Sequence, residues 1–554
     1  MSTELTSNEV PHRLVPDDEF DALCIEVENS SSDNDNALTD NPWLYKKLGK
    51  YPARRHARKV AKELGVSSGI VYLPGQVERL YEDSDMTFEF RQRRYFYYLT
   101  GADVPGCAVT YDIGADSLIL WAPRSDPRSV LWYGKFPTPD QYLAASDLDL
   151  VLNVQSVTTY LRSALTNPKN TLYVLSDDQA PNLSFPEDLI RARFDTTLLK
   201  PAMDRARVIK TEHEIALIRR ANAISSGAHK AVLDALPKCR TEADVYAVYQ
   251  SYCLSRHATR QAYPPIVASG ANASTLHYTD NNQPLAGRQV LLLDAGAEWR
   301  CYASDVTRTF PLTTTTGTAL CSGLDNNSRV LGFGKEAAAI YRAVHRMQSE
   351  CIAKVKPGVP FYSLHVHACR VAVEELLRLR ILRGGSVEDI LKKGTVTAFF
   401  PHGLGHHVGL EVHDVSGSTR LLLNASLSSE ADDPLWWRPA VGGRKNREIL
   451  TPGQAAMLYR DAAEFSRSGM VSPKAAERQI LEKNMVVTIE PGIYFCREYL
   501  DAYFLRHPVH SQYIDAKVLN QYWDVGGVRI EDDILVTEDG YENLTTAPKW
   551  EPEN

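Results

Sequence analysis

The segment PHGLGHHVGLEVHD, residues 401–414, places His402, His406, His407 and His413 within twelve residues, among glycines and ahead of a carboxylate. So many imidazoles in one short stretch are uncommon unless they bind a metal or transfer protons. The glycines would interrupt a helix, and no glutamate follows the first histidine as in the helical HExxH motif. The segment therefore predicts a metal ligand or a proton-transfer group on a strand or loop.

Four acidic residues stand in or at the ends of apolar strands elsewhere in the chain. Asp294 ends VLLLD, and Asp305 precedes VTRTF eleven residues later. Glu490 lies in VVTIEPG and Glu531 in GGVRIEDDILV. A buried carboxylate needs a cation partner, so each aspartate could instead pair with a nearby arginine such as Arg308. The pattern leaves a structural ion pair and a shared metal site both open.

Together with one imidazole from the histidine segment, the four carboxylates have the composition of a two-metal site. Their four negative charges balance two divalent cations. A set rich in oxygen with one imidazole suits relatively hard ions, which favours Mn(II) and leaves Co(II) and Zn(II) as alternatives. Two such ions can hold a bridging water, lower its pKa and polarise an acyl oxygen, so the set indicates metal-assisted hydrolysis.

The composition is that of a globular chain of 554 residues, with 44% hydrophobic and 23% charged residues, which excludes disordered, fibrous and membrane classes. The 61 Lys+Arg against 69 Asp+Glu give a formal charge of -8, so neither nucleic acid nor an anionic membrane is an expected partner. The nine cysteines are scattered and never form a Cys-x-x-Cys pair, which is typical of thiols in a reducing compartment. No secretory signal or membrane span is recognisable, and we expect a cytoplasmic location.

A polar tail and an α/β domain are predicted for the first part of the chain. Residues 1–45, which include SSSDNDNALTD, have too little apolar surface to fold, and we expect a mobile tail. Residues 46–200 begin with a basic helix, YPARRHARKVAKELG, and continue with short segments that resemble strands: GIVYLPG, YFYYLTG and SLILWAP. This alternation predicts an amino-terminal α/β domain.

A second domain, residues 205–550, is predicted to open on a long amphipathic helix, because Thr211 and Glu214 make a capping box ahead of apolar residues at helical spacing. QVLLLDAG and CYASDVTRTF then predict a hairpin, and the order of helices followed by strands recurs in the second half. The stretch at about 415–483 shows little periodicity, and we interpret it as a surface insertion that could form a lid.

The motifs resemble those of a known family. DAGAEWRCYASDVTRTF, HGLGHHVGLEVHD, TIEPGIYF and GGVRIEDDILVT occur in the order found in the prolidase and Xaa-Pro aminopeptidase group of dinuclear metallopeptidases, and FRQRRYFYYLTG resembles the amino-terminal domain of that group. The resemblance extends from about Tyr51 to Pro548. It implies an α/β amino-terminal domain followed by an α+β pita-bread catalytic domain, and it favours a homodimer.

The same resemblance implies roles for individual residues. Asp305 and Glu531 would bridge the two metals, His406 would be the sole imidazole ligand, and Glu490 would also relay the proton from the attacking water. Arg529 would orient the carboxylates through its fixed fork of donors. The implied metal ligands are Asp294, Asp305, His406, Glu490 and Glu531, and the residues implied to contact substrate and stabilise the tetrahedral intermediate are His277, His402 and His413.

The implied activity is removal of the amino-terminal residue that precedes proline, through a hydroxide bridging two Mn(II) ions. An Xaa-Pro dipeptidase (prolidase) is the alternative. A binding protein that has lost catalysis is a third interpretation, but such relatives lack metal ligands and this chain retains all five. His407 takes no role from the resemblance, because a residue adjacent to His406 on an extended segment should point to the opposite side.

Substrate length is least constrained by the sequence. The prolidase pattern has an arginine nine residues before the methionine that opens the metal strand, where its fork would bind the free carboxylate of a dipeptide. This chain has Ala476 at that position. We therefore expect a site that also accepts longer peptides, although four arginines of the insertion could reach it: Arg438, Arg444, Arg447 and Arg478.

Overall fold

A computed structural model describes residues 49–183, 193–314, 331–422, 449–469 and 478–550. The predicted tail, residues 1–45, and most of the middle of the predicted insertion lie outside these ranges. No helix among the described residues is both long enough and apolar enough to cross a membrane. The seven cysteines within these ranges are all free, and six of them are buried.

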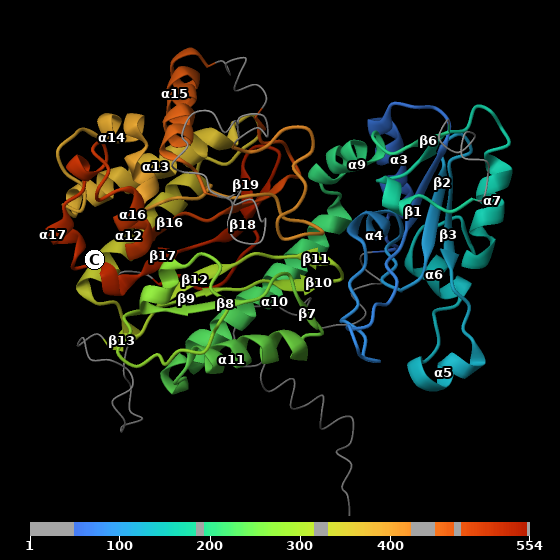
Figure 1. Cartoon of the computed structure of the whole chain (residues 1–554), viewed down its shortest axis with the longest axis horizontal. Coiled ribbons are helices and arrows are strands. Elements are labelled where there is room, and N and C mark those ends of the chain that lie inside the picture. Colours follow the sequence, from blue (N-terminus) through green and yellow to red (C-terminus); the bar gives the residue numbers. More distant parts are fainter. Residues whose placement is uncertain (1–48, 184–192, 315–330, 423–448, 470–477, 551–554) are drawn as a thin grey trace, which may run out of the picture. The chain divides into compact units, whose positions relative to one another are not determined.

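The amino-terminal domain (Figure 1) is built on a six-stranded sheet, in which the strand order is β4-β3-β2-β1-β5-β6. Its inner strands are buried on both faces, because alternate residues of β1 join two different apolar clusters. The α/β prediction for this domain is therefore confirmed. The strands are β1 (Ile70–Pro74), β2 (Ala108–Asp112), β3 (Ser117–Ala122), β4 (Leu150–Asn153), β5 (Leu172–Tyr173) and β6 (Phe194–Asp195), and the α-helices are α3 (Ala53–Leu64), α4 (Arg94–Thr100), α5 (Pro127–Tyr133), α6 (Pro139–Ala145) and α7 (Val157–Ala164).

The interpretation of YFYYLTG as a strand was wrong, since these residues form most of helix α4. Four aromatic residues followed by a leucine favour a strand by propensity, but a short apolar run cannot be distinguished from a buried helix by periodicity. Here Phe96, Tyr98 and Leu99 are fully buried around the helix, so tertiary burial outweighs local propensity. Gly101, at φ 66°, ends the helix in the left-handed conformation that glycine tolerates best.

The first half of the catalytic domain follows the predicted order. Thr211 caps α10 through a reciprocal capping box with Glu214, and the predicted hairpin is the antiparallel pair β9 and β12, in which Asp294 lies opposite Thr307. Helices α10 and α11 lie beside the strands of this half (Figure 1). The elements are α9 (Leu199–Val208), α10 (Glu212–Ala235), α11 (Glu242–Ser255), β7 (Arg260–Gln261), β8 (Ile266–Ser269), β9 (Val290–Asp294), β10 (Ala297–Trp299), β11 (Tyr302–Ala303), β12 (Thr307–Pro311) and β13 (Thr313–Thr314).

The second half repeats helices and then strands. Its two long helices pack on each other and enclose the largest apolar cluster with the strands that follow. This repeat confirms the prediction of two α-then-β halves. The elements are β14 (Leu331–Gly332), α12 (Lys335–Ile352), α13 (Phe361–Arg378), α14 (Val387–Lys393), α15 (Pro452–Ser468), β15 (Val486–Ile489), β16 (Gly492–Tyr494), α16 (Arg497–Tyr503), α17 (Ala516–Leu519), β17 (Gly527–Arg529), β18 (Asp532–Val536) and β19 (Tyr541–Asn543).

The two halves meet along their strands. An antiparallel bridge joins Thr307 of β12 to Glu531, between β17 and β18, and the Thr309 hydroxyl donates to the carbonyl of Arg529 at 2.9 Å. The loop with the four histidines is attached to β15, where Gly405 lies so close to Thr488 that a Cβ atom would approach its carbonyl oxygen to 2.0 Å. The junction therefore brings together segments from opposite ends of the domain.

The insertion is more regular than its sequence suggests. Residues 452–468 form helix α15, begun by a capping box between Thr451 and Gln454. Leu458 is fully buried and belongs to the main apolar cluster. Leu450 donates its backbone N–H to the carbonyl of Pro401, so this part of the insertion supports the start of the histidine segment.

Candidate metal centre

Four carboxylates converge at the junction of the two halves. Asp294 ends β9 and Asp305 precedes β12, while Glu490 follows β15 and Glu531 lies between β17 and β18. Backbone pairing fixes all four, because each stands at the end of a paired strand or beside it. Asp294, Asp305 and Glu531 are buried, and one oxygen of each lies within 4.8 Å of the others. The predicted set of acids is therefore assembled in space.

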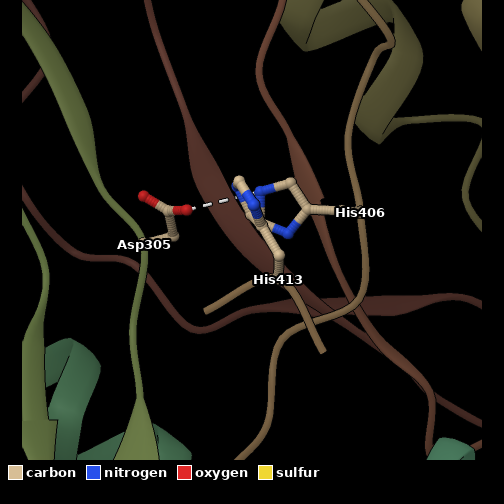
Figure 2. A group of neighbouring side chains, drawn as sticks. All are labelled: Asp305, His406 and His413. Carbon is tan, nitrogen blue, oxygen red and sulfur yellow. Dashed lines mark ion pairs between the residues drawn. The ribbon is translucent and has the colours of Figure 1, made fainter. Parts of the chain in front are cut away.

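His406 completes this cluster. Its Nε2 atom lies 3.4 Å from Asp305 Oδ2 and 3.2 Å from Glu490 Oε1. Its Nδ1 atom lies 3.1 Å from the carbonyl oxygen of His407, so Nδ1 carries a proton and directs Nε2 to the acids. Figure 2 shows Asp305 facing His406, with the ring of His413 beside it, and the two rings are 4.2 Å apart.

The acids of the cluster repel one another. Burial raises the pKa of Asp305 to about 6. A hydrogen bond from His406 acts in the opposite direction, and the negative charge of Asp294 adds to the increase. Burial and the neighbouring acids raise the pKa of Glu531 well above its usual range. Burial also opposes ionisation of Glu490, but hydrogen bonding and charge from His406 outweigh it and lower its pKa to about 2. Such crowding is typical of a site completed by cations.

The donor set fits divalent cations. Glu531 Oε1 is buried and has no hydrogen-bond partner among the described residues, so it is available as a ligand. Oxygen atoms from the carboxylates and one imidazole nitrogen match the donors preferred by hard to borderline divalent ions. The three possible ligand groups share members: Asp294, Asp305 and Glu531; His406, Glu490 and Glu531; and Asp305, His406 and His413.

Arg529 links the cluster to His402. Its Nη2 atom donates to Asp294 Oδ2 at 2.5 Å, and its Nη1 atom donates to the hydroxyl of Tyr494 at 2.9 Å. The same hydroxyl lies 2.8 Å from His402 Nε2. Because His402 Nδ1 donates to the carbonyl of Gly403 at 2.7 Å, Nε2 of the neutral ring accepts from Tyr494. Burial lowers the pKa of His402 to about 4, which favours this neutral ring.

The alternative pairing with Arg308 is not found. Arg308 donates to Asp532 Oδ1 at 2.8 Å and to backbone carbonyls, including that of Glu531 at 2.7 Å. It therefore supports the strand that carries Glu531 without contacting either aspartate of the cluster. The cation that neutralises Asp294 is Arg529, from the opposite half of the domain.

Tyr263 and Tyr494 were missed by the sequence analysis. The Tyr263 hydroxyl lies 2.5 Å from Asp294 Oδ1 and 2.5 Å from Asp305 Oδ1, so it holds the two acids of the hairpin together. Tyr494 lies four residues beyond Glu490, inside the motif TIEPGIYF. Neither tyrosine has a spacing that distinguishes it from a core aromatic residue, and only the contacts show its place.

A cavity of about 630 Å³ opens onto the cluster. His277, His402 and His413, which the resemblance implies as substrate contacts, all line it. His407 does not line the cavity, because its Nε2 forms a hydrogen bond of 2.6 Å with Gln479 Oε1 on the other side of the segment. This is the orientation predicted from its position next to His406. The cavity also has an apolar wall, formed by Pro264, Ile266, Leu421, Leu422 and Leu450.

Comparison with known families assigns the catalytic domain. A profile described as metallopeptidase family M24 matches residues 216–538. The chain belongs to metallopeptidase family M24. A second profile, described as the aminopeptidase P amino-terminal domain, matches residues 51–173 and thus the six-stranded sheet domain. M24 membership makes the chain a metallopeptidase and implies divalent metal ions.

Curated M24 relatives match along almost the whole chain. A probable Xaa-Pro aminopeptidase of Sordaria macrospora is 49% identical over 98% of this chain and 96% of its own length. A probable Xaa-Pro aminopeptidase of Colletotrichum graminicola is 48% identical, with 98% of this chain and 97% of the relative covered. The resemblance drawn from the motifs is therefore confirmed.

Two solved structures share the fold of this chain. Proline aminopeptidase P II from Yersinia pestis superimposes with a TM-score of 0.64 at 23% identity, covering 90% of this chain and 97% of that one. Aminopeptidase P from Escherichia coli with the inhibitor Pro-Leu gives a TM-score of 0.64 at 22% identity, with the same coverage. The predicted architecture, an α/β domain followed by a pita-bread catalytic domain, is confirmed.

Proposed function

We propose that this protein is an Xaa-Pro aminopeptidase that removes the amino-terminal residue preceding proline and works with two divalent metal ions, Mn(II) being favoured. One observation carries the proposal: a chain whose relatives at 49% identity are named probable Xaa-Pro aminopeptidases retains an intact cluster of four carboxylates and His406. An inactive binding protein of this fold is not supported, because its mark is the loss of such ligands.

The proposed ligands are Asp294, Asp305, His406, Glu490 and Glu531. Divalent ions held by these donors would lower the pKa of a bound water and would polarise the acyl oxygen of the scissile bond. Glu490 is the proposed acceptor of the proton from that water, since it reaches the cluster from β15 and hydrogen bonding and charge from His406 favour its carboxylate form. Arg529 keeps Asp294 in place, and Tyr263 spans the two aspartates.

The cavity histidines are proposed to act on the substrate. His277, His402 and His413 line the cavity beside the cluster, where they can contact the peptide and stabilise the tetrahedral intermediate. The apolar wall, which includes Ile266 and Leu450, suits the ring of a proline in second position. A cytoplasmic location and a homodimer are also part of the proposal, and light scattering on the purified protein tests the dimer.

The metal stoichiometry tests this proposal directly. Purified protein stripped with a chelator and reconstituted with Mn(II) is expected to hold two ions per chain, because two divalent cations would balance the four crowded carboxylates of the cluster. Elemental analysis measures the ratio. Activity should return with the metal on Ala-Pro-Ala and not on Ala-Ala-Ala. Full activity with a ratio near zero would exclude the proposed site.

A further inference from the structure

A buried ion cluster lies directly behind the histidine segment. Asp414, which follows His413, receives a hydrogen bond from Arg207 Nη2 to Oδ1 at 2.6 Å, and Lys210 Nζ lies 3.3 Å from Oδ2. No more than 2% of each of these three side chains is exposed. Both cations come from α9 and the residues after it, the stretch of chain that leads from the amino-terminal sheet to the catalytic helices.

Asp414 closes the loop that carries His413. Its backbone N–H donates to the carbonyl of His407 at 2.8 Å, so residues 407–414 form a closed loop with Asp414 at the base. Gly409 packs on the same carboxylate, since a Cβ atom there would lie 2.2 Å from Asp414 Oδ2. Lys210 donates its own N–H to the carbonyl of Asn484 at 2.8 Å, just before β15. The ion cluster and the two ends of the loop are thus connected by direct contacts.

The two ends of the loop hold two histidines that are fixed in different ways. His406, at the start, is fixed by the metal cluster and β15. His413, at the other end, lies with its ring 4.2 Å from that of His406 and is exposed toward the cavity, so its position depends on the backbone that Asp414 anchors. A displacement of about 1 Å in a group that acts on the substrate can lower the turnover rate strongly.

We propose that Arg207 is a positioning residue for catalysis: through Asp414 it fixes the loop that holds His413 over the metal cluster. Lys210 places a second positive charge beside the other carboxylate oxygen of Asp414, Oδ2. The segment between the two domains then has a direct part in turnover. This inference rests on the proposed role of His413 in acting on the substrate.

Arg207→Met tests the inference, and Arg205→Met is its matched control. Arg205 lies two residues away in the same helix, and its Nε pairs with Glu63 Oε2 at 2.8 Å rather than with Asp414. Arg207→Met is expected to lower kcat on Ala-Pro-Ala by about tenfold or more, with KM and metal content unchanged, whereas Arg205→Met stays within about twofold of the wild type.

A double-mutant cycle with His413→Ala separates positioning from a general structural role. If Arg207 acts through His413, Arg207→Met costs nothing further once His413→Ala is present. An equal loss of kcat in both backgrounds would overturn the inference, and so would an unchanged kcat in Arg207→Met when His413→Ala alone impairs turnover. If His413→Ala keeps the wild-type kcat, the proposed role of His413 fails instead.

Arg207→Lys covers the case in which Arg207→Met does not fold. This variant retains a positive charge beside the buried carboxylate of Asp414. It replaces the planar guanidinium, with its fork of donors, by the compact ammonium group of lysine. The same cycle with Arg207→Lys is expected to show a smaller loss of kcat that again disappears with His413→Ala. A folded Arg207→Lys with wild-type kcat, KM and pH profile would refute the positioning role.

Discussion

At the scale of single residues, neighbouring histidines of one segment have different partners. His406 faces Asp305 and Glu490, whereas His407, the next residue, bonds Gln479 on the opposite side. His402 lies within hydrogen-bond distance of the Tyr494 hydroxyl and lines the cavity. The division follows from extended backbone, in which successive side chains point to opposite faces. Chemistry at this site therefore depends on the register of the segment as much as on its composition.

Substituting these histidines one at a time should separate metal binding from catalysis. His406→Ala is expected to lose metal, because it removes the imidazole donor. His402→Ala should keep the metal and lower kcat by on the order of a hundredfold, since its ring is expected to act on the transition state. Metal analysis and kinetics on the same preparations decide, with His407→Gln as the control that retains metal. Equal metal loss in His402→Ala and His406→Ala would contradict this division.

Asp305 makes the effect of the metal depend on pH. Its pKa is raised to about 6, chiefly by burial, so the folded metal-free protein binds more protons here than the unfolded chain, whose aspartates titrate near 3.9. This group's contribution to stability therefore falls as pH rises from about 4 to about 6. Metal ions relieve the crowding of the ionised acids, so the stabilisation they give should grow over the same interval.

Thermal unfolding of metal-free and Mn(II)-loaded protein measures this difference. The gap in Tm is expected to be larger at about pH 7 than at about pH 4.5, and Asp305→Asn should make it smaller and flatter. A gap that stays constant across this range in the wild type would show that Asp305 does not exchange a proton for metal.

At the scale of elements, the strand ends position the acids and the insertion supports the segment that begins with His402. Helix α15 packs against α13 and α14. Ile449, just before this helix, forms an antiparallel β-bridge with His402. A stretch with little apparent periodicity thus becomes a supporting helix, because one buried row, including Leu458, is sufficient to hold it on the core.

Leu458→Ala tests the support given by α15. Removing a fully buried leucine side chain is expected to lower the free energy of unfolding by roughly 2–5 kcal/mol. Glu464→Ala, at an exposed position of the same helix, should change it by less than about 0.5 kcal/mol. Denaturant unfolding of the two variants gives both values. A neutral Leu458→Ala would mean that α15 is not anchored through this residue.

At the scale of the whole molecule, the cavity is assembled from segments that lie far apart in the chain. Its wall includes Arg420, near the start of the insertion, whereas Arg478 is buried, pairs with Asp461 Oδ2 at 2.7 Å and lies over the ring of Tyr362. Arg478 is thus engaged elsewhere and does not line the cavity. The other three arginines considered from the sequence, Arg438, Arg444 and Arg447, lie outside the described residues.

We therefore predict that the site accepts longer peptides. The specificity constants for Ala-Pro-Ala and Ala-Pro are expected to agree within about tenfold, because no arginine stands at the prolidase position to bind the carboxylate of a dipeptide. Arg420→Gln is the informative variant, since it should reduce only Ala-Pro cleavage if Arg420 binds that carboxylate. A preference for Ala-Pro above about a hundredfold, roughly 2.7 kcal/mol, would make the protein a dipeptidase.

The amino-acid sequence alone determined the composition of the metal cluster, the helices begun by capping boxes and the β9–β12 hairpin, because these depend on residue type and on spacing within one short segment. It also predicted the sheet domain ahead of the catalytic domain. The helical state of residues 94–100 and of α15 could not be predicted, since burial by distant segments outweighed the local pattern.

Only the tertiary structure decided which cation meets which acid. Arg529 and not Arg308 neutralises Asp294, Tyr263 spans the two aspartates, and Arg207 reaches Asp414 across 207 positions of sequence. A charged or phenolic side chain has many possible partners at such separations, and its own residue type favours none of them. The backbone pairing of two domain halves selects the partner, because it fixes which side chains share one buried volume.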